Sequence, residues 1–142
     1  MWSQYIKMLV LIVDSSVQII DRLEDLLLDA KNITHIHKAV SFTEAKKLFS
    51  ENTHDAVMLD IDLPENESFV LLKEIKKTAE KTCVIMLSTC MDYYILEHCK
   101  SLGADFFFDK YYDFEKICGV IDAMGQISEN PQAVTSKNSM TW

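Results

Sequence analysis

Five short runs of apolar residues recur along this chain, separated by stretches in which apolar residues have helical spacing. The runs lie near 8–14, 34–40, 55–60, 83–88 and 104–109. Runs of this length, rich in branched and aromatic residues, are typical of buried strands. Five strand–helix units in succession predict an α/β domain, a doubly wound (βα)5 sheet of five parallel strands with helices on both faces.

Apolar residues at helical spacing define one face of each of five predicted helices. They are Val17, Ile20, Leu23 and Leu27; Ala45, Leu48 and Phe49; Leu72, Ile75 and Ala79; Ile95, Cys99 and Leu102; and Phe114, Ile117, Ile121 and Met124. Ser15 and Ser41 are each followed three positions later by Gln or Glu, the spacing of a capping box, so both are predicted helix N-caps. Gly103 suits the C-terminal end of the fourth helix.

Four polar residues stand at the ends of apolar runs: Asp14, Asp60, Ser88 and Lys110. Ligands of an open parallel sheet bind outside the carboxyl ends of its strands, so these side chains are expected to meet at one edge. Mg²⁺ prefers oxygen ligands, a carboxylate is a weak but usable nucleophile, and lysine supplies a positive point charge. The set therefore suits a divalent cation and a phosphoryl group.

Composition limits the classes of function. The chain has 142 residues, which favours one domain, and its net charge of −8 disfavours non-specific binding to nucleic acid. No apolar stretch is long enough to cross a bilayer, and the start lacks the apolar core of a signal peptide. The four cysteines show no Cys-x-x-Cys spacing, which argues against a zinc or redox site and fits a reducing cytoplasm. We expect a cytoplasmic protein without a membrane partner.

The domain is predicted over residues 8–126. Residues 1–7 are interpreted as an N-terminal extension. The helical pattern fades after about residue 127, so 127–142 is interpreted as a polar C-terminal tail, too short for an output domain.

Three segments, 11–16, 58–64 and 103–110, resemble motifs of the receiver domain of bacterial two-component response regulators. The first matches the acidic motif of strand 1, the second the phosphoacceptor Asp with a Pro four residues later, and the third the Gly-Ala-Asp that precedes strand 5 together with its Lys. Ser88 stands where the family has Ser or Thr. The similarity covers about residues 8–125 and implies a single-domain, chemotaxis-regulator-like protein with a flavodoxin-like sheet in the order 2-1-3-4-5.

The resemblance also implies roles for individual residues. Asp60 would accept a phosphoryl group from a histidine kinase or phosphotransfer protein. A Mg²⁺ ion would be held by Asp14, by Asp60 and by the main-chain carbonyl of Asp62. Phosphoryl-binding and switch roles would fall to Ser88, Lys110 and Phe107.

The implied output is a contact with a downstream protein through the fourth helix, the fifth strand and the fifth helix. Nucleic acid is not expected as a partner, because the chain is acidic and no DNA-binding module follows residue 125. The protein would act as an acceptor in phosphoryl transfer rather than as an enzyme, with autodephosphorylation left open.

Several positions depart from the family pattern. Ser15 replaces the second acidic residue of strand 1, which predicts a weak Mg²⁺ site unless the Asp62 carboxylate compensates. Ser68 stands where Gly is usual, so a different turn is expected there, since Ser is poor at positive φ. Thr89 stands where Ala is frequent and Tyr111 where Pro is usual. Ser15 and Thr89 are candidate modulators of the site.

Two other classes of function remain as alternatives. A pseudo-receiver would keep the fold and bind partners without phosphorylation. A flavodoxin-like FMN carrier needs a hydroxyl-rich phosphate loop after strand 1, whereas 14–16 is short and begins with a carboxylate that repels phosphate. His35 and His37 share a strand face, but without an evident third metal ligand they are interpreted as edge-strand surface residues.

Overall fold

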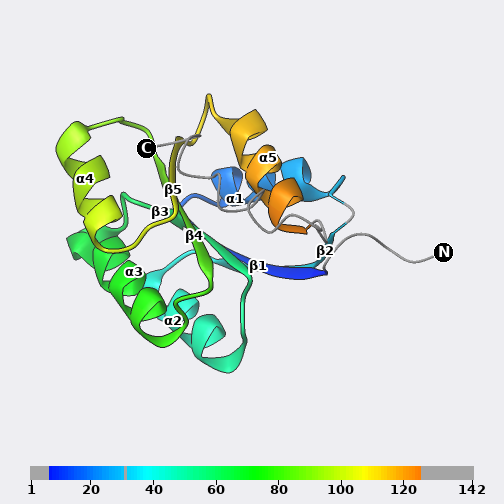
Figure 1. Ribbon diagram of the computed structural model, residues 1–142, viewed down its shortest axis with the longest axis horizontal. Helices are drawn as coiled ribbons and strands as arrows, with labels where there is room; N and C mark the ends of the chain where they lie inside the picture. Colours follow the sequence, from blue (N-terminus) through cyan, green and yellow to red (C-terminus); the bar gives the residue numbers. More distant parts are fainter. Residues whose placement is uncertain (1–6, 31, 126–142) are drawn as a thin grey trace.

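The central feature of the molecule is a parallel sheet, seen in a computed structural model that describes residues 7–30 and 32–125. Its strand order, β2-β1-β3-β4-β5, confirms the predicted doubly wound α/β fold (Figure 1). The strands are β1 (Met8–Val13), β2 (Ile33–Ala39), β3 (Ala56–Asp60), β4 (Cys83–Ser88) and β5 (Phe106–Asp109). Because β3 lies between β1 and β4, its C-terminal end is at the middle of the edge on which the predicted site depends.

Helices cover both faces of the sheet. They are α1 (Val17–Leu27), α2 (Phe42–Glu51), α3 (Glu67–Thr78), α4 (Tyr93–Ser101) and α5 (Phe114–Gly125), with a short 3-10 turn, η1 (Pro64–Asn66), before α3. Figure 1 shows α1 and α5 on one face and α2, α3 and α4 on the other. Among the described residues, none of the helices is both long and apolar enough to cross a membrane.

Two apolar cores hold these layers together, one on each face of the sheet. Along β1, Val10 and Ile12 pack toward α1 and α5, whereas Leu11 and Val13 pack toward α2 and α3. All four side chains are fully buried, and burial of each stabilises the fold by about 1.5–3 kcal/mol. The strand ends, and the polar residues that follow them, are thus fixed from both sides.

The start of α1 differs from the prediction. Ser16, not Ser15, is the N-cap, and its hydroxyl accepts a hydrogen bond from the N–H of Ile19. The physical reason is that the Asp14 carboxylate accepts a hydrogen bond from the N–H of Ser16 at 2.8 Å. This bond holds Ser15 outside the helix, which therefore begins one residue later than predicted. Val17, predicted on the buried face, is the first residue of α1 and is 55% exposed, so that part of the prediction is wrong.

The other two helix-end predictions are confirmed. Ser41 caps α2 by accepting a hydrogen bond from the N–H of Glu44. Gly103 follows α4 with φ of 99°, a left-handed conformation that glycine adopts readily. Most of the predicted N-terminal extension, 1–6, and the whole predicted tail, 127–142, lie outside the described residues.

Candidate functional site

The side chains of Asp14, Asp60 and Lys110 meet at the C-terminal edge of the sheet. The Lys110 ammonium lies 2.9 Å from Asp14 Oδ2 and 2.8 Å from Asp60 Oδ1. These residues come from the ends of three different strands, and none is more than 5% exposed. The structure therefore brings together three of the four residues that the sequence pattern placed at this edge.

The electrostatics of this triad follow from two buried carboxylates around one cation. Burial favours the uncharged form of Lys110, but its hydrogen bonds to Asp60 and Asp14 outweigh this and raise its pKa above the ordinary value. For Asp14, burial is the larger effect, and its pKa is raised despite the hydrogen bond to Lys110. The lysine therefore stays charged, and the two carboxyl groups beside it offer oxygen ligands that suit a further cation.

Asp62 joins the site through its main chain. Its N–H donates to Asp60 Oδ1 at 2.9 Å, while its own side chain is exposed at the rim. Desolvation and the charge of Asp60 raise the pKa of the Asp62 carboxyl, and the charge of Lys110, followed by hydrogen bonds from Thr89, partly offsets this. Thr89 is thus in contact with the rim of the site, where the sequence predicted a modulator.

Ser88 reaches this edge, but its hydroxyl is engaged elsewhere. Its main-chain carbonyl accepts from the N–H of Lys110 at 2.9 Å, which ties the ends of β4 and β5 together. The hydroxyl donates to the carbonyl of Cys90 at 2.7 Å and accepts from the N–H of Cys90 at 3.0 Å. Ser88 must therefore release Cys90 before it can donate to a group bound at Asp60.

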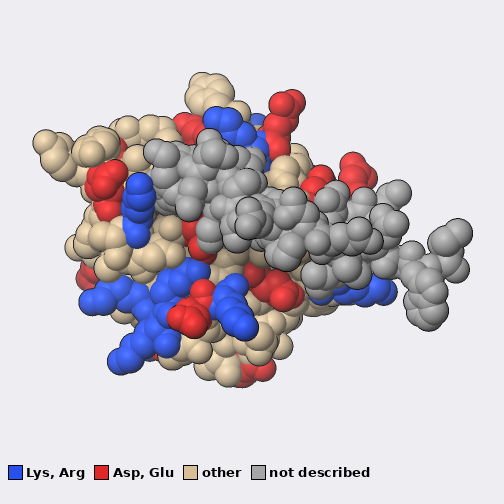
Figure 2. Space-filling view, in the orientation of Figure 1, with Lys and Arg blue, Asp and Glu red and all other residues tan. Residues whose placement is uncertain are grey.

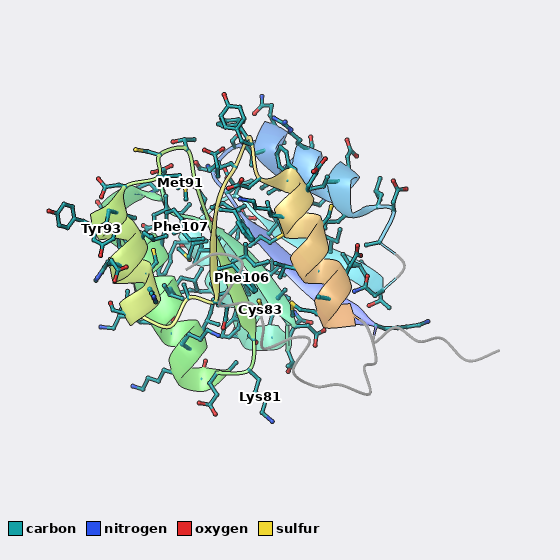
Figure 3. The ribbon with its side chains drawn as sticks, turned by 45° about the horizontal axis from the view of Figure 1, so that its top comes forward. Lys81, Cys83, Met91, Tyr93, Phe106 and Phe107 are labelled. Atoms are coloured by element: carbon teal, nitrogen blue, oxygen red, sulfur yellow. The ribbon has the colours of Figure 1, made fainter. Side chains whose placement is uncertain are left out.

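Phe107 lies inside the protein. It is 2% exposed and belongs to the core on the α2, α3 and α4 side, whereas Phe106 and Phe108 belong to the opposite core. Figure 3 shows Phe107 on the α4 side of β5, with Tyr93 on the outer side of α4. An effect of Phe107 on a partner would therefore pass through its packing.

The oxygen donors at the site fit the ligand preference of Mg²⁺. Asp14 and Asp60 supply two buried carboxylates, and the loop after β3 carries the main-chain carbonyl of Asp62. In the described ranges, no three side chains of His, Cys, Asp or Glu are grouped so as to hold a metal ion. Ser15 is exposed and adds no carboxylate. The residues fit a Mg²⁺ ion held by few protein ligands, and the predicted ligand set stays a prediction.

Sequence reasoning missed one buried contact of the phosphoacceptor candidate. Ser68 is fully buried in the first turn of α3, and its hydroxyl donates to the main-chain carbonyl of Asp60 at 2.5 Å. The left-handed conformations that were expected to exclude Ser at this position fall instead on Glu65, with φ of 55°, and Asn66, with φ of 59°. The departure from Gly was the available signal, but it was interpreted as a turn effect.

The fold and this site define a class of protein, an α/β domain with an acidic pair and a lysine at the ends of its strands. Residues 10–122 match the family model of the response regulator receiver domain. The chain belongs to this family, which confirms the resemblance found in its motifs.

Individual relatives agree with this assignment. The chain is 32% identical over 95 residues to a protein-glutamate methylesterase/protein-glutamine glutaminase from Nocardioides sp., a match covering 67% of this chain and 26% of that protein. It resembles the response regulator domain of Thermotoga maritima CheB with 27% identity and a TM-score of 0.68, covering 80% of this chain and 89% of that one.

A second solved structure supports the fold alone. The response regulator DrrB, an OmpR/PhoB homologue from Thermotoga maritima, matches with 21% identity and a TM-score of 0.69 over 82% of this chain and 51% of that one. The chain thus spans about a quarter of the curated relative and about half of DrrB.

Proposed function

We propose that this protein accepts a phosphoryl group on Asp60, with Mg²⁺, from a histidine kinase or phosphotransfer protein. The observation that carries the proposal is the buried bridge of Lys110 between Asp14 and Asp60. Phosphoryl transfer depends on positioning and on neutralising charge, and this bridge provides both next to a carboxylate.

The contacts of Asp60 suggest how the step proceeds. The N–H of Asp62 and the ammonium of Lys110 both bind Oδ1, so we take Oδ2 as the attacking atom. Oδ2 forms the new bond to phosphorus as the bond to the donor's leaving group breaks. Lys110 balances the charge of the arriving oxygens, and Asp14 with the Asp62 carbonyl would hold the Mg²⁺, which supplies further charge neutralisation.

Intact-protein mass spectrometry after incubation with acetyl phosphate and Mg²⁺ tests the proposal. Wild type should gain the mass of one phosphoryl group, and Asp60→Asn should gain none. The matched control is Asp55→Asn, which changes a carboxylate just before β3 that binds the N–H of Leu9. It should be labelled like wild type, and equal labelling of Asp60→Asn would refute the assignment.

We further propose that the output is a protein contact on the side of α4, β5 and α5. Exposed apolar residues gather in the loops and first turn beside the site: Met91, Tyr93, Tyr94, Tyr111 and Tyr112. The guanidinium of Arg22 on α1 lies 5.9 Å from the centre of the Tyr111 ring and 4.2 Å from that of Phe114, so the β5–α5 loop packs on α1. Aromatic residues of this kind are enriched in protein interfaces.

Nucleic acid fits this surface poorly. The net charge is −8, and on the face shown in Figure 2 lysines gather near α3 but are mixed with acidic side chains. Phosphate backbones are bound by surfaces with a clear excess of positive charge.

Amide NMR tests the output surface. Adding beryllofluoride and Mg²⁺, a phosphoryl mimic, should shift the amide signals of Tyr94 and Tyr112 more than those of Thr43 and Lys47 on α2. Shifts confined to α1 and α2 would contradict the proposed surface. From the cysteine spacing in the sequence, which fits a reducing compartment, we also propose that the protein is cytoplasmic.

The alternative of a pseudo-receiver rests on Ser15, which leaves this end of β1 with the single carboxylate of Asp14. In that case the protein would bind its partner without phosphorylation. Failure of beryllofluoride to bind at high Mg²⁺ concentration, with the fold intact, would favour the alternative.

A further inference from the structure

The loop between β3 and α3 returns to Asp60 at two points. The main-chain carbonyl of Asp60 accepts a hydrogen bond from Ser68 Oγ at 2.5 Å, and its carboxylate accepts one from the N–H of Asp62 at 2.9 Å. The first bond closes the loop from its far end, and the second holds its beginning. The phosphoacceptor candidate is thus also the anchor of the loop that carries Asp62.

This loop needs such an anchor because its backbone is unfavourable. Glu65 and Asn66 are both left-handed, with φ of 55° and 59°, and neither is a glycine. This conformation costs a non-glycine residue roughly 1–2 kcal/mol, less for Asn. Ile61 and Leu63 hold the loop down by burial, but Asp62 between them points outward. The N–H of Ile61 also donates to the main-chain carbonyl of Leu87 at 2.9 Å, and this bond acts together with the polar contacts at Asp60 to fix the position of Asp62.

Ser68 makes a contact that the family's usual glycine cannot make. It is fully buried, so no water competes for its hydroxyl, and the carbonyl that it binds belongs to the residue we propose as nucleophile. We infer that Ser68 is a positioning residue: its bond fixes the Asp60 peptide and, through the closed loop, the direction of the Asp62 N–H and carbonyl. This inference rests on the proposed function of the site.

The expected consequence is a looser loop when the hydroxyl is removed. In Ser68→Ala, the N–H of Asp62 should exchange with solvent roughly three to ten times faster, the change that a lost hydrogen bond produces. Removing an outer partner of metal ligands typically weakens metal binding by about tenfold or more, so Mg²⁺ affinity should fall by about tenfold. Ser68→Gly, which introduces the family's usual residue, should behave in the same way.

The chain offers a close control at the other end of β3. Thr82 is buried, and its hydroxyl donates to the main-chain carbonyl of His54 at 2.7 Å, just before β3 begins. Thr82→Val removes the same type of bond far from the site. It should lower the free energy of unfolding much as Ser68→Ala does, while leaving Asp62 exchange and Mg²⁺ affinity at wild-type values.

The experiment combines three measurements on the full chain. They are amide exchange of Asp62 by NMR without metal, the Mg²⁺ dissociation constant by calorimetry, and unfolding in urea. Positioning by Ser68 is supported if the two Ser68 variants change the first two and Thr82→Val changes only the third. Wild-type exchange and Mg²⁺ affinity in Ser68→Ala, or equal losses in Thr82→Val, would overturn it.

These results are separable from those on phosphorylation. If wild type gains no phosphoryl group but the Ser68 variants loosen Asp62 and weaken Mg²⁺ binding, the proposed function fails and the role of Ser68 in the loop remains. If wild type is labelled and the Ser68 variants match it in every measurement, the proposed function stands and the positioning role of Ser68 is refuted.

Discussion

The hydroxyl of Ser88 is bound on both sides by the main chain of Cys90, donating to its carbonyl and accepting from its N–H. Contact with a phosphoryl group at Asp60 would require this hydroxyl to turn away, which would free the loop that leads into α4. We therefore propose that Ser88 senses the phosphoryl group.

The first prediction concerns this role. Ser88→Ala should still be labelled at Asp60, because no step of bond formation needs the hydroxyl. The amide shifts that beryllofluoride causes at 89–94 should shrink, since the exchange of partners is lost. Phosphopeptide mapping and NMR measure the two effects, and complete loss of labelling would contradict the division of roles.

The second prediction concerns the bridge at Lys110. Lys110→Met leaves the buried carboxylates of Asp14 and Asp60 facing each other, and removing one member of a buried charge group typically costs about 3–5 kcal/mol. The control is Lys38→Met, whose exposed ion pair with Glu24 has an N–O distance of 3.1 Å and should be worth less than about 1 kcal/mol. Urea unfolding compares them, and equal losses would show that the bridge is not structurally important.

The third prediction concerns Ser15. It is exposed beside Asp14, and the helix cap belongs to Ser16, so Ser15→Asp should add a carboxylate without disturbing α1. Mg²⁺ affinity measured by calorimetry should rise by at least about tenfold. Removing a residue that only supports a metal ligand already lowers affinity by about tenfold or more, and a direct ligand should count for at least as much. Gln18→Glu adds the same charge to an exposed position of α1 and should have little effect. Unchanged affinity in Ser15→Asp would mean that Asp62 or water already fills this position.

The fourth prediction is a loss of stability in mild acid caused by His54. This side chain is 1% exposed, stacks on Phe49, and has its Nε2 3.0 Å from Nδ1 of His37. Burial, followed by the charge of His37, lowers its pKa from 6.5 to about 4, although Asp55 acts in the opposite direction. The unfolded chain therefore binds the proton at a higher pH than the folded protein does.

The resulting stabilisation is complete above pH 6.5 and is lost as the pH falls toward 4. It amounts to at most about 3.5 kcal/mol, at about 1.4 kcal/mol for each unit of pKa. Urea unfolding between these pH values should show a steeper decline for wild type than for His54→Leu. His98→Gln, on the exposed side of α4, should keep the wild-type slope. Parallel curves for wild type and His54→Leu would rule out His54 as the cause.

The meeting of Asp14 and Lys110 was predictable although 96 positions separate them. Each follows an apolar run, and the rule that parallel strands end at a common edge needs only the runs. Prediction failed where neighbouring residues satisfied the same pattern. Ser15 and Ser16 are both acceptable caps, and the choice was made by the Asp14 carboxylate, whose bond to the N–H of Ser16 leaves no trace in helical periodicity.

Hydrogen bonds from side chains to the main chain could not be predicted from the sequence pattern either. The partners of Ser88 and Ser68 are carbonyl and amide groups, which every residue but proline possesses, so no residue type marks them. The sequence likewise could not show whether Tyr93 and Tyr94 are buried or exposed, because an aromatic pair at the start of a helix suits either a core or a surface. Packing of the helix against the sheet decided it.

The site residues lie at the strand ends, away from the solvent faces of the helices, and this separation affects how sequences with this fold can diverge. The chemical groups are held by strands whose side chains lie inside two cores, whereas the solvent faces of the helices do not hold them. Substitutions can accumulate on those faces without moving the carboxylates or the lysine. A backbone shared with DrrB at 21% identity is what such a division permits. Substitutions on the helix surfaces can therefore change the binding partner of a protein with this fold, while the carboxylates and the lysine at the sheet edge are retained.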